Sequence, residues 1–329
     1  MTEFNTPLDK IITDDKITIP PSPFLNRLGY GTGVVLYRSP RAILTTPCTY
    51  KTMCKGWKPS KESKKTEADL LQRVSHPNIT EFCKSRKHSK IHYLRMGGCA
   101  LFLGEIIERK IGSNYEPFLP KHILKLAADI ASALDYLHTK VQILHGDVRS
   151  YNILVRGKFE ICKLYGLTAT APLDENGVFD KNKPGQERFP GYKTRWSAPE
   201  VINEGEISCK TDVWSVGLAL WEMLTLIPPH AVPGCTCGEE EPSTDEDGPE
   251  TVKNYLTARY GTRPAVPVNI SETQYMHALI LIYWCTETDP TRRLTAQHLC
   301  TAARDMLDHL RYGFWFPHLN HGQPLCLKS

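Results

Sequence analysis

Residues 143–155 constrain the fold of this chain more than any other stretch, and they read Ile-Leu-His-Gly-Asp-Val-Arg-Ser-Tyr-Asn-Ile-Leu-Val. Asp147 and Asn152 lie five residues apart, between a helix-like segment that ends at His138 and an apolar run that ends at Val155. Both the residue types and their spacing can carry chemistry. Gly and Asp are also common turn formers, so an ordinary polar turn is the alternative interpretation of this stretch alone. The rest of the chain decides between the two.

A glycine-rich segment precedes a strand-like run near the N-terminus. Its alternating glycines lead into β-branched and apolar residues that include Leu36, and they are Gly29, Gly31 and Gly33. Glycine lets a backbone turn tightly and approach phosphate oxygens closely. The segment therefore predicts a phosphate-binding loop followed by a strand. A glycine-rich hairpin without a ligand is the alternative.

A lysine on a short strand and a glutamate on a helix follow. Lys51 lies in the strand-like run 48–53, and Glu67 lies in a helical segment whose apolar face holds Leu70, Leu71 and Val74. Proline after His76 predicts the end of this helix.

Further motifs then follow in order along the chain. They are Gly-Tyr-Gly-Thr-Gly-Val at 29–34, Arg-Ser-Pro-Arg at 38–41, His-Pro-Asn-Ile at 76–79, Leu-His-Gly-Asp at 144–147, Pro-Leu-Asp-Glu-Asn at 172–176 and Gly-Thr-Arg-Pro at 261–264. Over residues 18–310 the chain resembles the family of lymphokine-activated killer T-cell-originated protein kinases, also called PDZ-binding kinases. That family has Gly after the catalytic-loop histidine, so Gly146 in place of the usual Arg is a family trait.

The resemblance implies roles for individual side chains. Asp147 would accept the proton of a substrate hydroxyl, and Asn152 would bind the metal that accompanies ATP. Lys51 would touch the α- and β-phosphates while Glu67 fixes its position. Arg149 replaces the lysine that usually lies beside the γ-phosphate.

The resemblance also implies a nucleotide site between the glycine-rich segment and a hinge at residues 94–98, where backbone groups bind adenine. The third glycine of this chain comes one position earlier than in the kinase pattern G-x-G-x-x-G. The implied nucleotide-binding positions are Gly29, Gly31, Gly33, Leu36, Lys51, Leu94, Met96 and Asn152.

One carboxylate of the kinase site is missing from the sequence. The family places a metal-binding Asp fourteen residues after the position of Asn152, and this chain has Gly166 there. A shifted register would place Leu164 at that position, so neither register supplies a carboxylate. The ungapped register is preferred because it keeps residues 172–176 in step with the family. Asn152 alone is a neutral, weaker ligand, which makes Mg²⁺ a doubtful cofactor beside ATP.

The resemblance implies an α+β fold with two lobes, a small β-rich lobe over residues 24–96 and a larger, mainly helical lobe over residues 97–312. Residues 1–23 are polar and rich in proline, which predicts a flexible arm. Residues 234–250 predict an acidic, solvated loop, and residues 313–329 form a tail. The apolar spacing over residues 121–138 predicts a helix with a broad buried face. Glu200 and Arg293 are expected to pair, as a structural device of the large lobe.

Composition limits the partners and the location. The net charge of +4 over 329 residues, with no basic stripe, gives no reason to expect nucleic-acid binding. No apolar run is long enough to cross a bilayer, and the N-terminus lacks the pattern of a signal peptide. Eleven cysteines without a disulfide spacing predict buried thiols in a reducing compartment, the cytoplasm or nucleus, and the Cys235–Cys237 pair does not predict zinc. We expect a monomer that binds protein substrates or partners.

Two functions remain open from the sequence. The first is an ATP-dependent serine/threonine kinase with weakened metal dependence or activity, and the second is a pseudokinase that acts as a scaffold or allosteric module. Four of the five catalytic side chains remain, which favours the enzyme by a small margin. The resemblance implies a role in mitosis. The C-terminal Pro-Leu-Cys-Leu-Lys-Ser does not resemble a PDZ-binding end, so that partnership is not expected.

Overall fold

The structure is a computed structural model of the 329-residue chain. It describes residues 34–38, 48–53, 70, 72–80, 82–88, 91–97, 101–111, 116–186, 188–191, 193–231, 259–266, 270 and 272–312. In the first four strands it describes the backbone alone. The predicted arm at 1–23, the acidic loop at 234–250 and the tail at 313–329 lie outside these residues, so their boundaries stay predictions.

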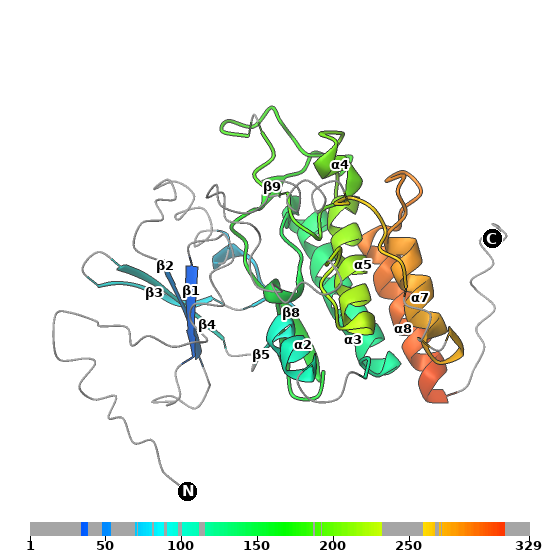
Figure 1. The fold of residues 1–329 in the computed structure, drawn as a ribbon. Helices are drawn as coiled ribbons and strands as arrows, with labels where there is room; N and C mark the ends of the chain where they lie inside the picture. Colours follow the sequence, from blue (N-terminus) through cyan, green and yellow to red (C-terminus); the bar gives the residue numbers. More distant parts are fainter. Residues whose placement is uncertain are drawn as a thin grey trace, which may run out of the picture.

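An antiparallel sheet of four strands forms the N-terminal part, in the order β1-β2-β4-β3 (Figure 1). The strands are β1 (Val34–Arg38), β2 (Cys48–Met53), β3 (Phe82–His88) and β4 (Ile91–Gly97). The register makes Leu36 and Leu94 the cross-strand neighbours of Lys51 on either side. Three positions expected at the nucleotide site therefore lie in one row across the sheet.

The C-terminal part is mainly helical, and Figure 1 shows its long helices packed side by side, apart from the sheet. The helices are α2 (Leu103–Ile111), α3 (Pro120–Tyr136), α4 (Pro199–Ile202), α5 (Lys210–Thr225), α7 (Glu272–Cys285) and α8 (Ala296–Tyr312). The predicted helix over 121–138 corresponds to α3, which begins at a proline and continues as a π-helical turn at Leu137–Val141. The apolar positions expected to be buried there, Ile123, Leu126, Ala127, Ile130, Leu134 and Leu137, are all fully buried.

Short strand pairs hold the loop that carries Asp147. A three-stranded sheet contains β5 (Leu101–Phe102), β7 (Ile153–Arg156) and β8 (Ile161–Leu164), in the order β5-β7-β8. A second pair joins β6 (Ile143–Leu144) to β9 (Ala171–Pro172). The loop between β6 and β7 is thus anchored at both ends by apolar, buried strands. No helix among the described residues is long and apolar enough to cross a bilayer.

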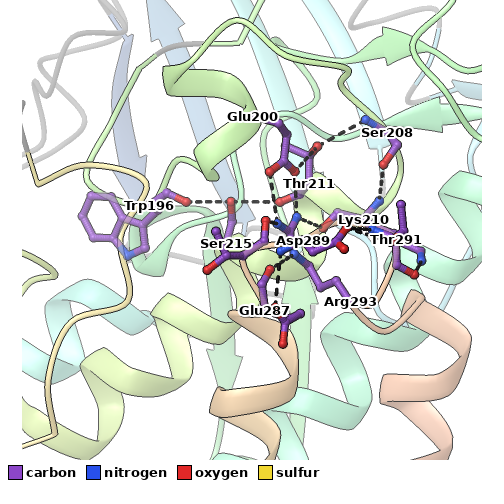
Figure 2. A network of polar contacts seen from close by, with 11 residues as sticks. Trp196, Glu200, Ser208, Lys210, Thr211, Ser215, Glu287, Asp289, Thr291 and Arg293 are labelled. Atoms are coloured by element: carbon purple, nitrogen blue, oxygen red, sulfur yellow. Dashed lines mark hydrogen bonds and ion pairs between the residues drawn. The ribbon is translucent and has the colours of Figure 1, made fainter.

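A buried ion pair joins α4 to the segment before α8. Arg293 donates from Nη1 to Glu200 Oε1 at 2.6 Å and from Nη2 to Oε2 at 3.0 Å, as the sequence predicts (Figure 2). Arg293 is 2% exposed and also donates to the carbonyls of Glu287 and Lys210. Thr211 donates to Glu200 at 2.9 Å, so both partners are satisfied by further hydrogen bonds.

We expect Arg293→Ala to lower the free energy of unfolding by ~3–5 kcal/mol, because it leaves the Glu200 carboxylate buried without its partner. Chemical denaturation of the full chain measures this change. Arg292→Ala removes an exposed neighbour of the same type and should change stability by less than about 0.5 kcal/mol. Equal effects of the two substitutions would show that the pair does not contribute to stability.

Candidate functional site

The carboxylate of Asp212, at the start of α5, fixes the first residues of the catalytic-loop stretch. Its oxygens accept hydrogen bonds from the backbone N–H groups of His145 at 2.8 Å and Gly146 at 2.9 Å. His138 Nε2 lies 2.8 Å from Asp212 Oδ2. Burial raises the pKa of this carboxyl, but the hydrogen bond and charge of His138 and the nearby His145 outweigh burial and lower the pKa overall.

His145 connects the loop to the segment that follows β8. Its Nδ1 accepts from the backbone N–H of Asp147 at 3.2 Å, which leaves Nε2 to donate to the carbonyl of Tyr165 at 3.1 Å. Burial lowers the pKa of His145, and the nearby carboxylates reverse this only in part, so the ring is neutral and keeps this tautomer. The loop and residue 165 are therefore held in one geometry.

Gly146 has a backbone conformation that explains why no larger residue stands there. Its φ of +77° lies in the left-handed region, and a Cβ built on it would lie 2.4 Å from the carbonyl oxygen of Ala169. An arginine at this position would need both a strained backbone and a displaced segment 167–171. The glycine thus lets the segment after β8 pack directly on the loop.

Gly146→Ala should destabilise the chain by more than the ~1–2 kcal/mol that a left-handed backbone alone costs. Gly185→Ala is the matched control, because Gly185 has the same φ of +77° and its Cβ would meet nothing within 4 Å. Thermal or chemical denaturation of both variants separates the two contributions. If the two variants lose the same free energy of unfolding, the close approach of Ala169 adds no cost to a side chain at position 146.

The structure brings together three of the predicted site residues, the catalytic Asp147 and Arg149 and the metal-binding Asn152. Asn152 Nδ2 donates to the backbone carbonyl of Asp147 and to its carboxylate Oδ2, both at 2.7 Å. Arg149 Nε lies 3.2 Å from Asp147 Oδ1, although this nitrogen makes no hydrogen bond of good geometry to a described residue. All three residues are at most 8% exposed. Asp147 also borders a small cleft lined by Phe189, Thr194 and other residues of the loop and of α5.

Position 166 faces the amide of Asn152. Gly166 has a φ of +86°, and a Cβ built on it would lie 3.2 Å from Asn152 Oδ1. Leu164 lies instead in β8, fully buried in the main core. The ungapped register predicts this placement, because only a side chain at position 166 would project toward Asn152.

The described residues do not form a magnesium site. Asn152 Oδ1 is a single neutral oxygen, and both carboxylate oxygens of Asp147 already contact Asn152 or Arg149. Across the described chain, no group of three or more His, Cys, Asp or Glu side chains could hold a metal ion. Magnesium at phosphoryl-transfer sites is held by one or two carboxylates together with phosphate oxygens and water, and here both oxygens of the Asp147 carboxylate already have protein contacts.

The remaining predicted site residues are placed only in part. Lys51, Leu36 and Leu94 are neighbours across β1, β2 and β4, and Met96 pairs with Thr49 in the same sheet. The glycines at 29, 31 and 33 and Glu67 lie outside the described residues. The structure therefore describes the side chains of the catalytic-loop group, and for the phosphate-binding group it gives only the strand register.

Sequence reasoning missed a second carboxyl, Glu222, ten residues after Asp212 on the same helix. Ser150 Oγ and Trp196 Nε1 each donate to it at 3.1 Å, so it joins the catalytic loop to the segment 194–198. It is 2% exposed, and burial raises the pKa of its carboxyl to about 8. No sequence signal separates such a glutamate from a surface residue of an amphipathic helix, because its burial depends on how α5 packs.

Stability should depend on pH through Glu222. Its carboxyl ionises near pH 4.5 in the unfolded chain and near pH 8 in the folded one, so unfolding releases a proton between these values. Its contribution is complete below pH 4.5 and falls as pH rises to about 8. Glu222→Gln mimics the protonated form and does not ionise. Between pH 5 and pH 8 its free energy of unfolding should therefore rise relative to that of the wild type, by about a few kcal/mol. If the free energy of unfolding of the two proteins changed with pH in parallel, Glu222 would not be a buried, neutral carboxyl.

Comparisons with known proteins agree with this geometry. The protein kinase domain family matches residues 24–303. Lymphokine-activated killer T-cell-originated protein kinase of Homo sapiens is 34% identical over 298 residues, which cover 87% of this chain and 90% of that protein. A light-sensor protein kinase of Ceratodon purpureus is 28% identical over 82% of this chain and 21% of its own length. Tyrosine-protein kinase Fgr of Mus musculus is 28% identical over 55% of this chain and 34% of its own length. The α+β fold with two lobes is confirmed.

Proposed function

The chain belongs to the protein kinase family and is of the lymphokine-activated killer T-cell-originated type, and from that premise we propose that it transfers the γ-phosphoryl group of ATP to serine or threonine hydroxyls of proteins. The fixed position of Asp147 carries the proposal. Its carboxylate is held by Asn152 from its own loop, while Asp212 holds the preceding backbone from α5. Such a rigid carboxylate beside a cleft suits a group that orients a hydroxyl.

The proposed chemistry uses residues of this chain as follows. Asp147 accepts the proton of the acceptor hydroxyl, whose oxygen forms a bond to the γ-phosphorus as the bond to the β-phosphate oxygen breaks and ADP leaves. Arg149, whose Nε lies 3.2 Å from Asp147, offsets the negative charge of the phosphoryl group in transfer. In this proposal Lys51 contacts the α- and β-phosphates, and Glu67 fixes the position of Lys51.

A second candidate function is a pseudokinase that serves as a binding module. The observation that favours it is the glycine at position 166, which faces Asn152 and supplies no carboxylate for a metal. Without that ligand, charge on the phosphates is offset mainly by cationic side chains, so turnover is slow. Nucleotide binding with and without magnesium distinguishes a nucleotide-binding cleft from an empty one before any substrate is known.

The wild type should bind ATP with little dependence on magnesium, and Gly166→Asp should bind magnesium-ATP more tightly and transfer phosphate faster. The φ of +86° costs an L residue ~1–2 kcal/mol, which Asp tolerates better than most. Gly166→Asn is the matched control, because it has the same shape and backbone demand without the charge. Calorimetry measures the binding, and peptides bearing Ser, Thr or Tyr measure the transfer and the acceptor preference.

Two further variants separate the outcomes. Asp147→Asn in the Gly166→Asp background should abolish the gain in transfer, because no acceptor for the hydroxyl proton remains. Leu164→Asp should increase neither magnesium-ATP binding nor phosphate transfer. It should also destabilise the chain, because Leu164 is fully buried. The kinase function would be excluded if the wild type bound no nucleotide and the Gly166→Asp variant bound none either. The pseudokinase binding module would then be the remaining function.

Three expectations stay predictions at this stage. We propose that the protein acts in the cytoplasm or nucleus, works as a monomer and takes part in mitosis, the last from family resemblance alone. None of the three alters the chemistry proposed for Asp147 and Arg149.

A further inference from the structure

The ring of Phe189 lies directly against the catalytic loop, although Phe189 belongs to a later segment of the chain. A Cβ built on Gly146 would lie 3.3 Å from Phe189 Cζ, and a Cβ built on Gly191 would overlap Phe189 Cε1. The ring therefore sits between two glycines, one in the catalytic loop and one in its own segment. A side chain at either position would press on it.

A second aromatic ring, that of Phe179, contacts Phe189. The two ring centres lie 5.8 Å apart with an interplanar angle of 69°, which is the edge-to-face arrangement that aromatic pairs favour. Phe179 is 4% exposed and belongs to a buried apolar cluster with Leu144 of β6 and Ala171 of β9, and Phe189 packs against this cluster. The ring thus joins the segment 188–198 to the strand pair that anchors the catalytic loop.

Phe189 also lines the cleft that Asp147 borders. Thr194 and Ser197, from the same segment as Phe189, line this cleft too. Both are buried, and the backbone N–H of Thr194 donates to Ser197 Oγ at 2.7 Å, so this part of the segment has a defined turn. A displacement of Phe189 would therefore change the wall of the cleft beside the Asp147 carboxylate.

The glycine at position 146 determines which kind of side chain can hold the segment there. Kinase activation loops are often ordered by phosphorylation, which creates new pairs between arginine and the phosphate. Position 146 supplies no cation for such a pair, and the side chain that packs on it is an apolar ring. A ring makes this contact without any modification. Loss of the ring should release the segment, whereas removal of phosphate should not.

We propose that Phe189 is a positioning residue that holds the segment 188–198 on the catalytic loop beside Asp147, and that this aromatic contact orders the segment without phosphorylation. Phe189 acts through the wall of the cleft in which an acceptor hydroxyl would reach Asp147, and it does not contact the reacting atoms. The role for the acceptor rests on the proposed kinase function, whereas the holding of the segment does not.

Hydrogen exchange of the full chain without nucleotide tests the holding of the segment. In Phe189→Ala the amides of residues 188–198 should exchange at least about tenfold faster, because opening of the segment no longer has to displace the ring. Trypsin should also cleave faster after the exposed Arg188 and Lys193, which flank the ring in sequence. Phe189→Leu keeps most of the apolar contact and should restore most of the protection. The amides of α3 should not change, which separates local release from global unfolding.

Two glycine substitutions test the same contact without altering Phe189. Gly191→Ala removes the space for the ring, so it should also release the segment. Gly205→Ala is the matched control, because its Cβ would lie no closer than 3.6 Å to Glu200, an ordinary contact, and protection should stay unchanged. Equal protection of residues 188–198 in the wild type, Phe189→Ala and Gly191→Ala would overturn the proposal.

Phosphatase treatment of the wild type tests the second part of the proposal. Mass spectrometry confirms that the treated chain carries no phosphate, and the protection of residues 188–198 should be the same as before treatment. A loss of protection as large as that of Phe189→Ala would show that phosphate orders the segment, and it would overturn this part.

Phosphate transfer to dephosphorylated casein tests the role for the acceptor. Phe189→Ala should raise the KM for casein about tenfold and leave the KM for ATP unchanged, because only the wall of the acceptor cleft moves. Phe189→Leu should lie between the wild type and Phe189→Ala. An equal rise in both KM values, or no rise in either, would overturn the positioning role. A wild type that transfers no phosphate would overturn the proposed function and the acceptor role together, while hydrogen exchange would still decide whether Phe189 holds the segment.

Discussion

The hydrogen bonds of the buried Asp212 carboxylate are the interaction on which the site depends. Helix α5 is buried along most of its length, so its first turn is a rigid platform. From there one carboxylate accepts from two successive backbone N–H groups of the catalytic loop, and a histidine fixes its orientation. A loop of polar residues has few apolar contacts to define its shape. Here the buried carboxylate of Asp212 defines the shape of the loop, and the position of Asp147 follows from that shape.

The same helix fixes the other side of the site through Glu222. Asp212 is held ionised by hydrogen bonds and nearby histidines, whereas Glu222 is kept neutral by burial. The first can therefore anchor N–H donors strongly, and the second links Ser150 to Trp196 without adding a negative charge near Arg195. The two acidic residues of one helix thus differ in ionisation, and this difference depends on which neighbouring groups contact each carboxyl.

Sequence alone predicted those parts of the fold and site that local pattern determines. The buried face of α3 follows from its apolar spacing, and the partnership of Glu200 with Arg293 follows from family resemblance. The spacing from Asp147 to Asn152 predicted a catalytic loop, and the structure adds a hydrogen bond between the two side chains. The role of Asp212 and the neutrality of Glu222 could not be predicted, because each depends on contacts between segments far apart in the chain. The close approach of Ala169 to Gly146 also could not be predicted, because motif spacing carries no information about it.

The proposed kinase function depends on how the negative charge of the transferred phosphoryl group is offset near Asp147. A magnesium ion normally supplies two positive charges beside the transferred phosphoryl group, and the ungapped register expects its carboxylate ligand at position 166. In this chain that position is a glycine, while a guanidinium lies 3.2 Å from Asp147. A guanidinium offers a single delocalised charge and fixed donors, so it can orient phosphate oxygens but offsets less of the developing charge. In the proposed mechanism, Asp147 accepts the hydroxyl proton and Arg149 orients the phosphoryl group, and charge stabilisation is the step that a single guanidinium supports least.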